Sequence, residues 1–287
     1  MTDSTPRTVQ SVLVWGTRCL SEAGIDGGAR DARLLMAHAL DIDPSRITLV
    51  APDPLPDEKA TAFEIMIARR IAREPVSHIL GRRNFYGRDF VVTSDVLDPR
   101  PETEILVAEA LKRPFSSVLD MGVGSGAILL TLLAEQPLAK GQGSDLSAQA
   151  LAVARANADH LGVAKRARFV QSDWFEAIEG HFDLIVSNPP YIALSEMPDL
   201  SPELAHEPRM ALTDEADGLE AYRIITAGAA AKLTPRGRIF LEIGPTQGEA
   251  VAGMLLTNGF KAVRVVSDLD GRDRVVCGVA TGSISSD

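Results

Sequence analysis

The sequence predicts an α/β protein: a mostly parallel, Rossmann-like sheet preceded by a small all-helical region. From about residue 117, short apolar runs alternate with stretches of helical periodicity, which is typical of a parallel, doubly wound sheet. Before residue 80, apolar residues recur at helical spacing only. Near the end of the chain one helical stretch is followed by two strand-like runs, which indicates a terminal hairpin and therefore an antiparallel edge strand.

The first 80 residues are predicted to form a helical domain that recognises the substrate, because they carry no constellation of reactive side chains. Asp57 is a plausible N-cap after three prolines, and Pro75 is expected to end the last helix. The predicted helices are 8–24, 29–40, 44–50 and 57–73.

Residues 81–98 are predicted to be a linker that contains a β-hairpin. Aromatic and β-branched residues surround Gly87, as in two short strands joined at a turn. The segment Pro99–Glu104 follows and opens a helix over 102–111 with acids in its first turn. It is either only a helix start or a rigid lip beside an active site. The predicted catalytic domain comprises residues 99–282.

The remaining elements alternate along this predicted catalytic domain. Pro235, Arg236 and Gly237 are expected to form a turn between the last long helix and the fifth strand. The predicted strands are 118–121, 140–145, 167–171, 182–187, 238–243, 261–266 and 274–280, and the predicted helices are 127–135, 148–161, 219–233 and 247–257.

Composition excludes several classes of protein. The 287 residues carry a formal net charge of −10, whereas proteins that bind nucleic acid through phosphate contacts are usually basic. We therefore expect no direct nucleic-acid binding. A cluster of arginines could still form a local basic patch, or it could be a solvated helix face that runs into a loop. Its members are Arg69, Arg70, Arg73, Arg82, Arg83 and Arg88.

The cysteines and the apolar runs give information on the cellular compartment of the protein. Cys19 and Cys277 are far apart and lack metal-ligand spacing, so neither a disulfide framework nor a zinc site is expected. The first residues do not resemble a signal peptide, and no apolar run approaches the length of a membrane span. The sequence predicts a soluble, cytoplasmic protein without a membrane partner.

A glycine-rich loop follows the first predicted strand of the sheet and precedes a helix. Its residues are Gly122, Val123, Gly124, Ser125 and Gly126. Glycines at this position allow a tight turn and the close approach of a ligand to a helix N-terminus. The loop lacks the Lys-Ser/Thr pair of a phosphate-binding P-loop, so phosphoryl transfer is not indicated.

Two further strand ends carry side chains suited to an adenosine ligand. Asp145 lies about twenty residues after the glycine loop, the spacing at which a carboxylate reaches ribose hydroxyls. Asp173 and Trp174 end the third strand, where they could hydrogen-bond to an adenine and stack on it. The alternative role of Asp173 is that of a helix cap.

The fourth strand ends in Asn188, Pro189, Pro190 and Tyr191, which we predict to be the catalytic residues. The Asn side chain and the carbonyls that precede the prolines can accept hydrogen bonds from a planar –NH2 group, while the tyrosine ring covers it. The alternative is a rigid turn with a structural tyrosine. Because the carboxyl ends of parallel strands share one crevice, the four strand ends together indicate methyl transfer from S-adenosylmethionine to an amide or amine nitrogen, without a metal or a catalytic histidine.

At these residues the sequence resembles the HemK/PrmC family of glutamine methyltransferases, and the resemblance extends over nearly the whole chain. Asn-Pro-Pro-Tyr alone also occurs in DNA adenine methyltransferases. One departure is Asp98, where the family usually has an apolar residue. The matching stretches are Pro99–Glu104, Asp120–Gly126, Gln171–Trp174, Asn188–Ile192 and Asp270–Arg274.

The resemblance implies an S-adenosylmethionine-dependent methyltransferase fold with the cofactor held by Gly122–Gly126, Asp145 and Trp174. It implies that Asn188 and the Pro189 carbonyl hold the glutamine amide. The implied substrate is the Gly-Gly-Gln glutamine of class I peptide chain release factors, with docking partly by the N-terminal helices. A ribosomal-protein glutamine and, less favoured because of the acidic composition, DNA adenine are the alternative substrates.

Overall fold

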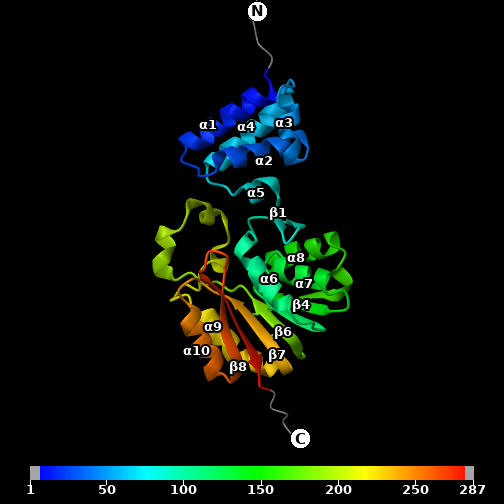
Figure 1. Ribbon diagram of the computed structural model, residues 1–287, viewed down its shortest axis with the longest axis vertical. Helices are drawn as coiled ribbons and strands as arrows, with labels where there is room; N and C mark the ends of the chain where they lie inside the picture. Colours follow the sequence, from blue (N-terminus) through cyan, green and yellow to red (C-terminus); the bar gives the residue numbers. More distant parts are fainter. Residues whose placement is uncertain (1–6, 282–287) are drawn as a thin grey trace, which may run out of the picture. The chain divides into compact units, whose positions relative to one another are not determined.

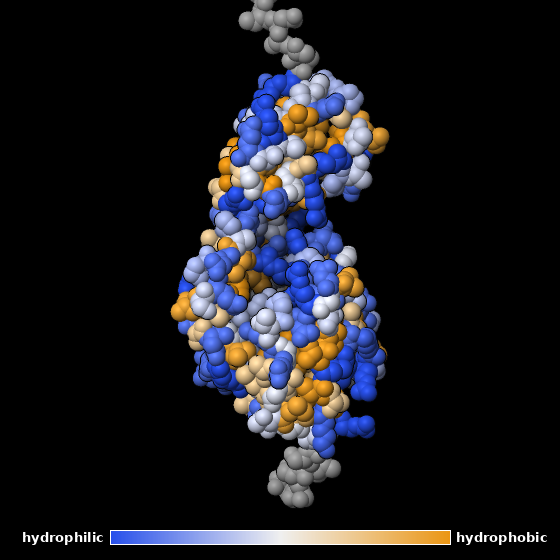
Figure 2. Space-filling view, turned by 60° about the vertical axis from the view of Figure 1, so that its left-hand side comes forward, coloured by the Kyte–Doolittle hydropathy of each residue, from blue (hydrophilic) through white to orange (hydrophobic). Residues whose placement is uncertain are grey.

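The computed structural model describes residues 7–281. The chain forms two compact units (Figure 1). The first contains the residues up to Gly81 together with Pro202–His206, and the second contains Arg82–Ser201 and the residues from Glu207 onward. Within residues 7–281, no helix is long and apolar enough to cross a membrane. On the face shown in Figure 2, hydrophobic residues lie in small groups between hydrophilic ones.

The first unit is helical, as predicted. A Cβ atom on Gly16 would lie 2.6 Å from Cζ of Phe63, so the glycine lets α1 approach α4 closely. Figure 1 shows α1, α2 and α4 packed together. The α-helices are α1 (Val9–Glu22), α2 (Gly28–Leu40), α3 (Ile47–Val50), α4 (Asp57–Ile71) and α5 (Val76–Leu80).

Three details of this unit differ from the prediction. Residues 44–50 do not form a single helix but a 3₁₀ turn, Pro44–Arg46, followed by α3. Pro56 occupies the N-cap position of α4, and Asp57 is its first residue, where its negative charge favours the helix N-terminus. The five-residue helix α5 was not predicted, because a single turn carries too little periodicity to be recognised.

The predicted hairpin is present in the second unit. Strands β1 (Arg82–Phe85) and β2 (Arg88–Val91) pair in antiparallel register, with Phe85 opposite Arg88. The connecting residues Tyr86 and Gly87 have φ angles of 50° and 73°. Two positive φ values in a row are those of a two-residue hairpin turn.

The second unit is built on a seven-stranded sheet with the order β5-β4-β3-β6-β7-β9-β8. The first five strands in chain order are parallel, and β9 pairs antiparallel with both β7 and β8. The strands are β3 (Ser117–Met121), β4 (Lys140–Asp145), β5 (Ala167–Gln171), β6 (Phe182–Ser187), β7 (Leu233–Glu242), β8 (Phe260–Ser267) and β9 (Asp273–Ala280).

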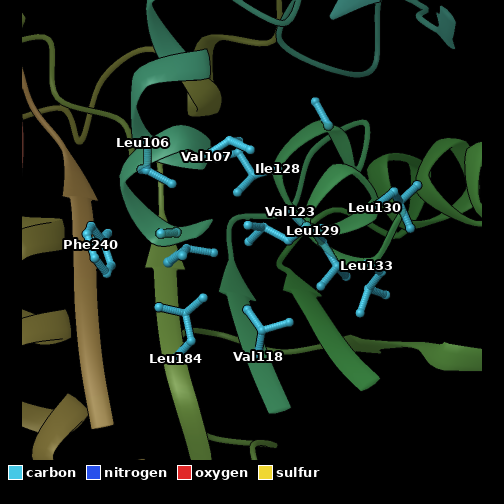
Figure 3. Packing of buried hydrophobic residues seen from close by; sticks show 14 of the residues in the cluster. Leu106, Val107, Val118, Val123, Ile128, Leu129, Leu130, Leu133, Leu184 and Phe240 are labelled. Atoms are coloured by element: carbon cyan, nitrogen blue, oxygen red, sulfur yellow. The ribbon is translucent and has the colours of Figure 1, made fainter. Parts of the chain in front are cut away.

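Helices cover both faces of the sheet. Val118 and Leu184 point to one face with α6, α7 and α8, whereas their neighbours Leu119 and Ile185 point to the other with α9 and α10. Figure 3 shows the first of these cores. The helices are α6 (Glu104–Leu111), α7 (Ala127–Glu135), α8 (Ala148–His160), α9 (Glu220–Ala229) and α10 (Gly248–Thr257).

The terminal hairpin has an arrangement that the sequence pattern does not specify. The antiparallel strand is β9, and it lies between β7 and β8, so that the edge strand β8 runs in the direction of β7. The expected turn Pro235–Gly237 lies inside β7 instead, as a bulge: Phe182 pairs with Leu233 and Leu184 with Arg238. The preceding α-helix therefore ends at Ala229 rather than at Leu233.

This topology positions the site. The chain proceeds from β3 through β4 to β5 on one side, and then returns to place β6 on the other side of β3. Such a reversal of strand order opens a crevice at the carboxyl ends of the strands. The glycine loop after β3 and the Asn188 loop after β6 are therefore neighbours.

Candidate active site

A cavity in the second unit brings together most of the predicted site residues. It also includes Arg100 and Thr103, from the segment before α6 for which a lip beside an active site was one of the two expectations. Met210, in the long loop after β6, was not predicted. Three predicted residues, Gly126, Pro189 and Tyr191, are not among those that line it. The predicted residues that line the cavity are Gly122, Val123, Gly124, Ser125, Asp145, Asp173, Trp174, Asn188 and Pro190.

The glycine loop is held in place by its own backbone. The N–H groups of Gly122 and Val123 both donate to the Ser144 carbonyl at 2.9 Å. Gly122 and Gly124 have φ angles of 71° and 52°, which residues other than glycine rarely adopt. Of the described residues, none has an atom within 4 Å of a Cβ built on Gly124, so the loop leaves open space on the cavity side.

Gly126 has a different task. Its φ angle is 86°, and a Cβ atom there would lie 2.8 Å from Cδ1 of Leu130. The residue is the N-cap of α7 and is not itself among the residues that line the cavity. It allows the helix to begin immediately beneath the loop.

Asp145 connects the second strand end to the glycine loop. Its Oδ2 accepts a hydrogen bond from Gly124 N at 3.0 Å, and its Oδ1 accepts one from Ser147 N at 2.9 Å. Burial raises the pKa of this carboxyl, and the backbone N–H groups act in the opposite direction. The carboxylate retains lone pairs on the cavity wall for hydroxyl donors.

Asp173 and Trp174 follow β5 at the cavity wall. Asp173 is exposed, and Trp174 is partly buried against the core shared with α9 and α10. Trp174 has a φ angle of 42°, and its carbonyl accepts a hydrogen bond from the Ser172 hydroxyl at 2.9 Å. Both residues line the same cavity as Asp145.

Asn188 stands at the junction of the glycine loop and the long loop after β6. Its Nδ2 donates to Thr103 Oγ1 at 3.4 Å. Its Oδ1 is buried and has no hydrogen-bond partner among residues 7–281. A buried acceptor without a partner is costly unless a ligand completes it.

Tyr191 lies behind the cavity rather than in it. Its ring packs against the core that contains Tyr222 and Val251, and its carbonyl accepts from Gln247 Nε2 at 2.9 Å. Burial raises the pKa of the Tyr191 hydroxyl to about 12, so this group stays protonated at neutral pH. Pro189 is also buried. Neither residue is therefore among those that line the cavity.

Asn157 lies outside the cavity lining but supports the glycine loop, and the sequence did not single it out. Its side chain is fully buried, and its amide bridges two segments: Nδ2 donates to Val91 O at 2.9 Å and to Ser125 O at 2.8 Å, while Oδ1 accepts from Val91 N at 2.7 Å. It thus fastens the glycine loop to the hairpin strand β2. An asparagine on the inward face of a predicted helix was the available signal.

Two buried carboxyls were also missed. Asp120 in β3 accepts from Leu129 N at 3.1 Å, and burial raises its pKa to about 8. Glu242 at the end of β7 is 1% exposed, and burial raises its pKa to about 7. Each directly follows an apolar run of its strand, Val118-Leu119 or Ile239-Phe240-Leu241, which is the signal that could have singled it out.

The departure at Asp98 has a structural explanation. Asp98 is buried, with Arg83 Nη1 at 3.5 Å and Arg100 Nη1 at 3.9 Å from its Oδ2. Arg100 also donates to both carboxylate oxygens of Glu207, at 2.8 and 2.9 Å. Asp98 therefore serves as a counterion in a network that ties the residues before α6 to the loop after β6.

The arginine cluster is largely neutralised within each unit. In the first, Arg70 binds Asp31 at 2.9 Å and Glu203 at 3.0 Å, and Arg69 pairs with Glu74. In the second, Arg83 and Arg88 pair with Asp98 and Glu135. These arginines hold carboxylates of the same chain, which leaves little positive charge for phosphates.

The residues present fit S-adenosylmethionine. The open space over Gly124 admits a ligand at the start of α7, Asp145 offers acceptors for hydroxyls, and Trp174 offers a face for stacking. In the part of the chain that the structure describes, no group of three or more His, Cys, Asp or Glu could hold a metal ion.

Comparison with known proteins agrees with this geometry. Residues 11–81 match the PrmC N-terminal domain, and residues 89–218 match the methyltransferase small domain. A methyltransferase of known structure from Pyrococcus furiosus shares the fold, with 16% identity and a TM-score of 0.54 over 76% of this chain and 98% of that one. Fold, cavity and domain matches define an S-adenosylmethionine-dependent methyltransferase.

Relatives specify the family further. The release factor glutamine methyltransferase of Cereibacter sphaeroides is 57% identical over 90% of this chain and 93% of its own length. That of Caulobacter vibrioides is 44% identical over 91% of this chain and 92% of its own length. The chain belongs to the release factor glutamine methyltransferase family.

Proposed function

We propose that this chain transfers a methyl group from S-adenosylmethionine to the side-chain amide nitrogen of the glutamine in the Gly-Gly-Gln motif of class I release factors. The proposal is supported by the family membership and by one observation in particular. The Oδ1 atom of Asn188 is a buried acceptor at the cavity, without a partner among the described residues. A carboxamide –NH2 group is a donor that would complete it.

The task of the protein is alignment rather than activation by a base. A carboxamide nitrogen is a weak nucleophile because its lone pair is delocalised. When bound, S-adenosylmethionine supplies a strongly electrophilic methyl group on sulfonium. Asn188 Oδ1 and the Pro189 carbonyl hold the two amide N–H groups, so that the lone pair points at the methyl carbon. The same acceptors stabilise the positive charge that develops on nitrogen.

The balance of the reaction requires no oxidant and no metal. The nitrogen lone pair forms the new N–C bond, the S–C bond breaks, and the sulfonium becomes a neutral thioether. The N-methylated amide then loses one N–H proton to solvent, because a protonated amide is very acidic.

We assign recognition of the protein substrate to the helical region 1–80, with 81–98 as the linker and 99–282 as the catalytic part. Support comes from large apolar side chains exposed on the helical unit, including Leu49 (75% exposed) and Ile65 (57% exposed). If this assignment holds, Leu49→Asp or Ile65→Asp raises KM for the intact release factor and leaves methylation of a short Gly-Gly-Gln peptide unchanged. Release factors act with ribosomes, so the proposed site of action is the cytoplasm.

The decisive test uses labelled S-adenosylmethionine with a purified class I release factor and with the same factor after Gln→Ala in its Gly-Gly-Gln motif. Label in the first and none in the second supports the proposal. Equal label in both would refute it. If neither form of the factor is labelled, the same assay with ribosomal proteins and with DNA tests the two alternative acceptors, and label there would refute the proposal.

A further inference from the structure

The buried carboxylate of Glu242 has no part in the proposed reaction, yet it lies beside the acceptor site. Ser187 of β6 is paired with Leu241 of β7. The next residues, Asn188 and Glu242, therefore leave neighbouring parallel strands at the same level, and paired positions in such strands face the same side of the sheet. A buried carboxylate at this position needs a reason, because burial of a charge is costly.

Thr103 stands between these two residues. It is 4% exposed and ends the 3₁₀ turn Pro101–Thr103 that leads into α6. Its Oγ1 accepts from Asn188 Nδ2 at 3.4 Å. Its hydroxyl also lies near enough to Glu242 to favour the charged carboxylate, although neither Glu242 oxygen has a donor in full hydrogen-bond geometry within residues 7–281.

The chemistry of the three groups gives one direction to the series of hydrogen-bonding groups Glu242, Thr103 and Asn188. An ionised carboxylate can only accept hydrogen bonds, so an ionised Glu242 favours the orientation of the nearby Thr103 hydroxyl in which its single proton points toward the carboxylate. The hydroxyl oxygen must then accept, which selects the NH2 end of Asn188. The two ends of a carboxamide have nearly the same shape, and only such a network distinguishes them. Oδ1 is left facing away from Thr103, and it is the atom without a partner.

We propose that Glu242 and Thr103 are positioning residues that fix the orientation of the Asn188 carboxamide, so that its oxygen rather than its NH2 group meets the substrate amide. The inference rests on the proposed function, because only a donor such as an –NH2 group needs an acceptor here. The reversed carboxamide would place donor against donor.

Several charged or titratable groups face Glu242, and they decide its protonation. Burial raises its pKa to about 7, whereas the Thr103 hydroxyl and the guanidinium of Arg274 on β9 favour the charged form. Glu102 opposes ionisation, and Arg100 supports it. Tyr191 and Tyr222 also lie within electrostatic range. A protonated Glu242 can donate a hydrogen bond to Thr103, and the Thr103 hydroxyl then no longer has to accept from the Asn188 NH2 group.

The first arm of the test removes single links. Thr103→Val keeps the side-chain shape without the hydroxyl, and Glu242→Gln replaces the pure acceptor with a group that can also donate. We expect each to lower kcat roughly tenfold, which is the effect of about one hydrogen bond, with the S-adenosylmethionine Kd within about twofold. Thr103→Ser should restore most of kcat.

A matched control is available in α7. Thr131 is also fully buried, and its hydroxyl has no partner in the described part of the chain. Thr131→Val should leave kcat and the pH profile unchanged. This control separates the loss of a buried hydroxyl as such from the loss of the link to Asn188.

The second arm needs neither substrate nor cofactor. The ¹⁵N side-chain NH2 signal of Asn188, assigned by its loss in Asn188→Ala, should shift with pH with a midpoint near 7 in the otherwise unchanged protein. Glu242→Gln should abolish that shift. In the same variant, the dependence of kcat on pH should become flatter on the acid side. If Thr103→Val does not fold, this titration alone tests whether Glu242 orients the Asn188 carboxamide.

The outcomes distinguish this inference from the proposed function. No transfer by the wild-type protein to the release factor refutes the function, while the titration of the Asn188 signal still tests the orientation. An active wild-type protein with unchanged kcat in both Thr103→Val and Glu242→Gln overturns the inference. An Asn188 signal that does not respond to pH overturns it as well.

Discussion

The two halves of the crevice satisfy their polar groups in different ways. In the cofactor half, Asp145 has a backbone donor on each carboxylate oxygen, and the N–H groups of Gly122 and Val123 share one carbonyl. In the acceptor half, one oxygen of Asn188 and both of Glu242 lack a partner in good geometry among residues 7–281. Asp120, beneath the glycine loop, is intermediate, with one bonded oxygen and one without a partner.

The difference indicates which part of the crevice lowers the stability of the fold. Polar groups that the backbone satisfies hold a surface rigid for a ligand that is always the same. Unsatisfied buried groups lower stability, and they are retained where a substrate completes them. The polar groups of the cofactor half are thus largely satisfied within the protein, whereas the acceptor half keeps a buried acceptor, Asn188 Oδ1, without a partner among residues 7–281.

The largest expected effect comes from emptying the acceptor half. Asn188→Ala removes the acceptor that we propose holds the amide, so kcat should fall roughly 100-fold or more. The S-adenosylmethionine Kd should change little, because the glycine loop and Asp145 are untouched. Steady-state transfer assays with calorimetric titration of the cofactor measure both. A loss seen mainly in cofactor affinity would assign Asn188 to the other half.

A pH titration of stability measures the cost in the acceptor half. Glu242 has a pKa of about 7 in the folded protein, against an ordinary value of 4.5. The unfolded chain loses this proton first, so the free energy of unfolding falls as the pH rises from about 4.5 to 7. Glu242→Gln lacks this penalty. Over that pH window its free energy of unfolding should therefore rise relative to that of the wild type, by at most about 3 kcal/mol.

Urea denaturation at pH 5 and pH 8 checks this expectation. Asp120 also has a raised pKa, but it contributes equally to both proteins and cancels in the difference. A constant difference between wild type and Glu242→Gln at the two pH values would mean that Glu242 is not buried as a carboxyl.

The rigidity of the cofactor half can be broken at one glycine. Gly126→Ala adds a methyl group 2.8 Å from Leu130 Cδ1 at a φ of 86°, and should cost roughly 2 kcal/mol of stability. Cofactor affinity should fall with it. Gly253→Ala in α10 is the matched control: within the described residues no atom lies within 4 Å of its Cβ, and the change should be neutral or stabilising. Thermal melts with and without cofactor compare the two.

The smallest effect is expected at Asp145. Asp145→Asn keeps an acceptor for Gly124 N but removes the charge that strengthens hydrogen bonds from ribose hydroxyls, so cofactor Kd should rise about tenfold. The kcat at saturating cofactor should change little. Asp159→Asn, at an exposed position of α8, serves as the control. An unchanged Kd in Asp145→Asn would show that the carboxylate only holds the loop.

Much of this protein was predictable because local signals agree with the fold. Strand β6, helix α7 and the loop between β3 and α7 lie where apolar runs, glycines and prolines predicted them. The order of strands at the carboxyl end was not predictable, since β9 between β7 and β8 depends on long-range pairing. The bulge at Pro235–Gly237 was mistaken for a turn for the same reason: the strand continues on both sides of it only because β6 offers partners.

The glycine loop, Asp145 and Asn188 could be proposed as site residues without a structure, because their residue types and their spacing from strand ends suit one kind of ligand. The residues that support these groups became visible only in the folded protein. Asn157, Thr103 and Glu242 come from a helix, a 3₁₀ turn and a distant strand. No local pattern links them to Asn188 or to the glycine loop, because hydrogen bonds between segments 32 to 85 residues apart form only when the sheet is assembled.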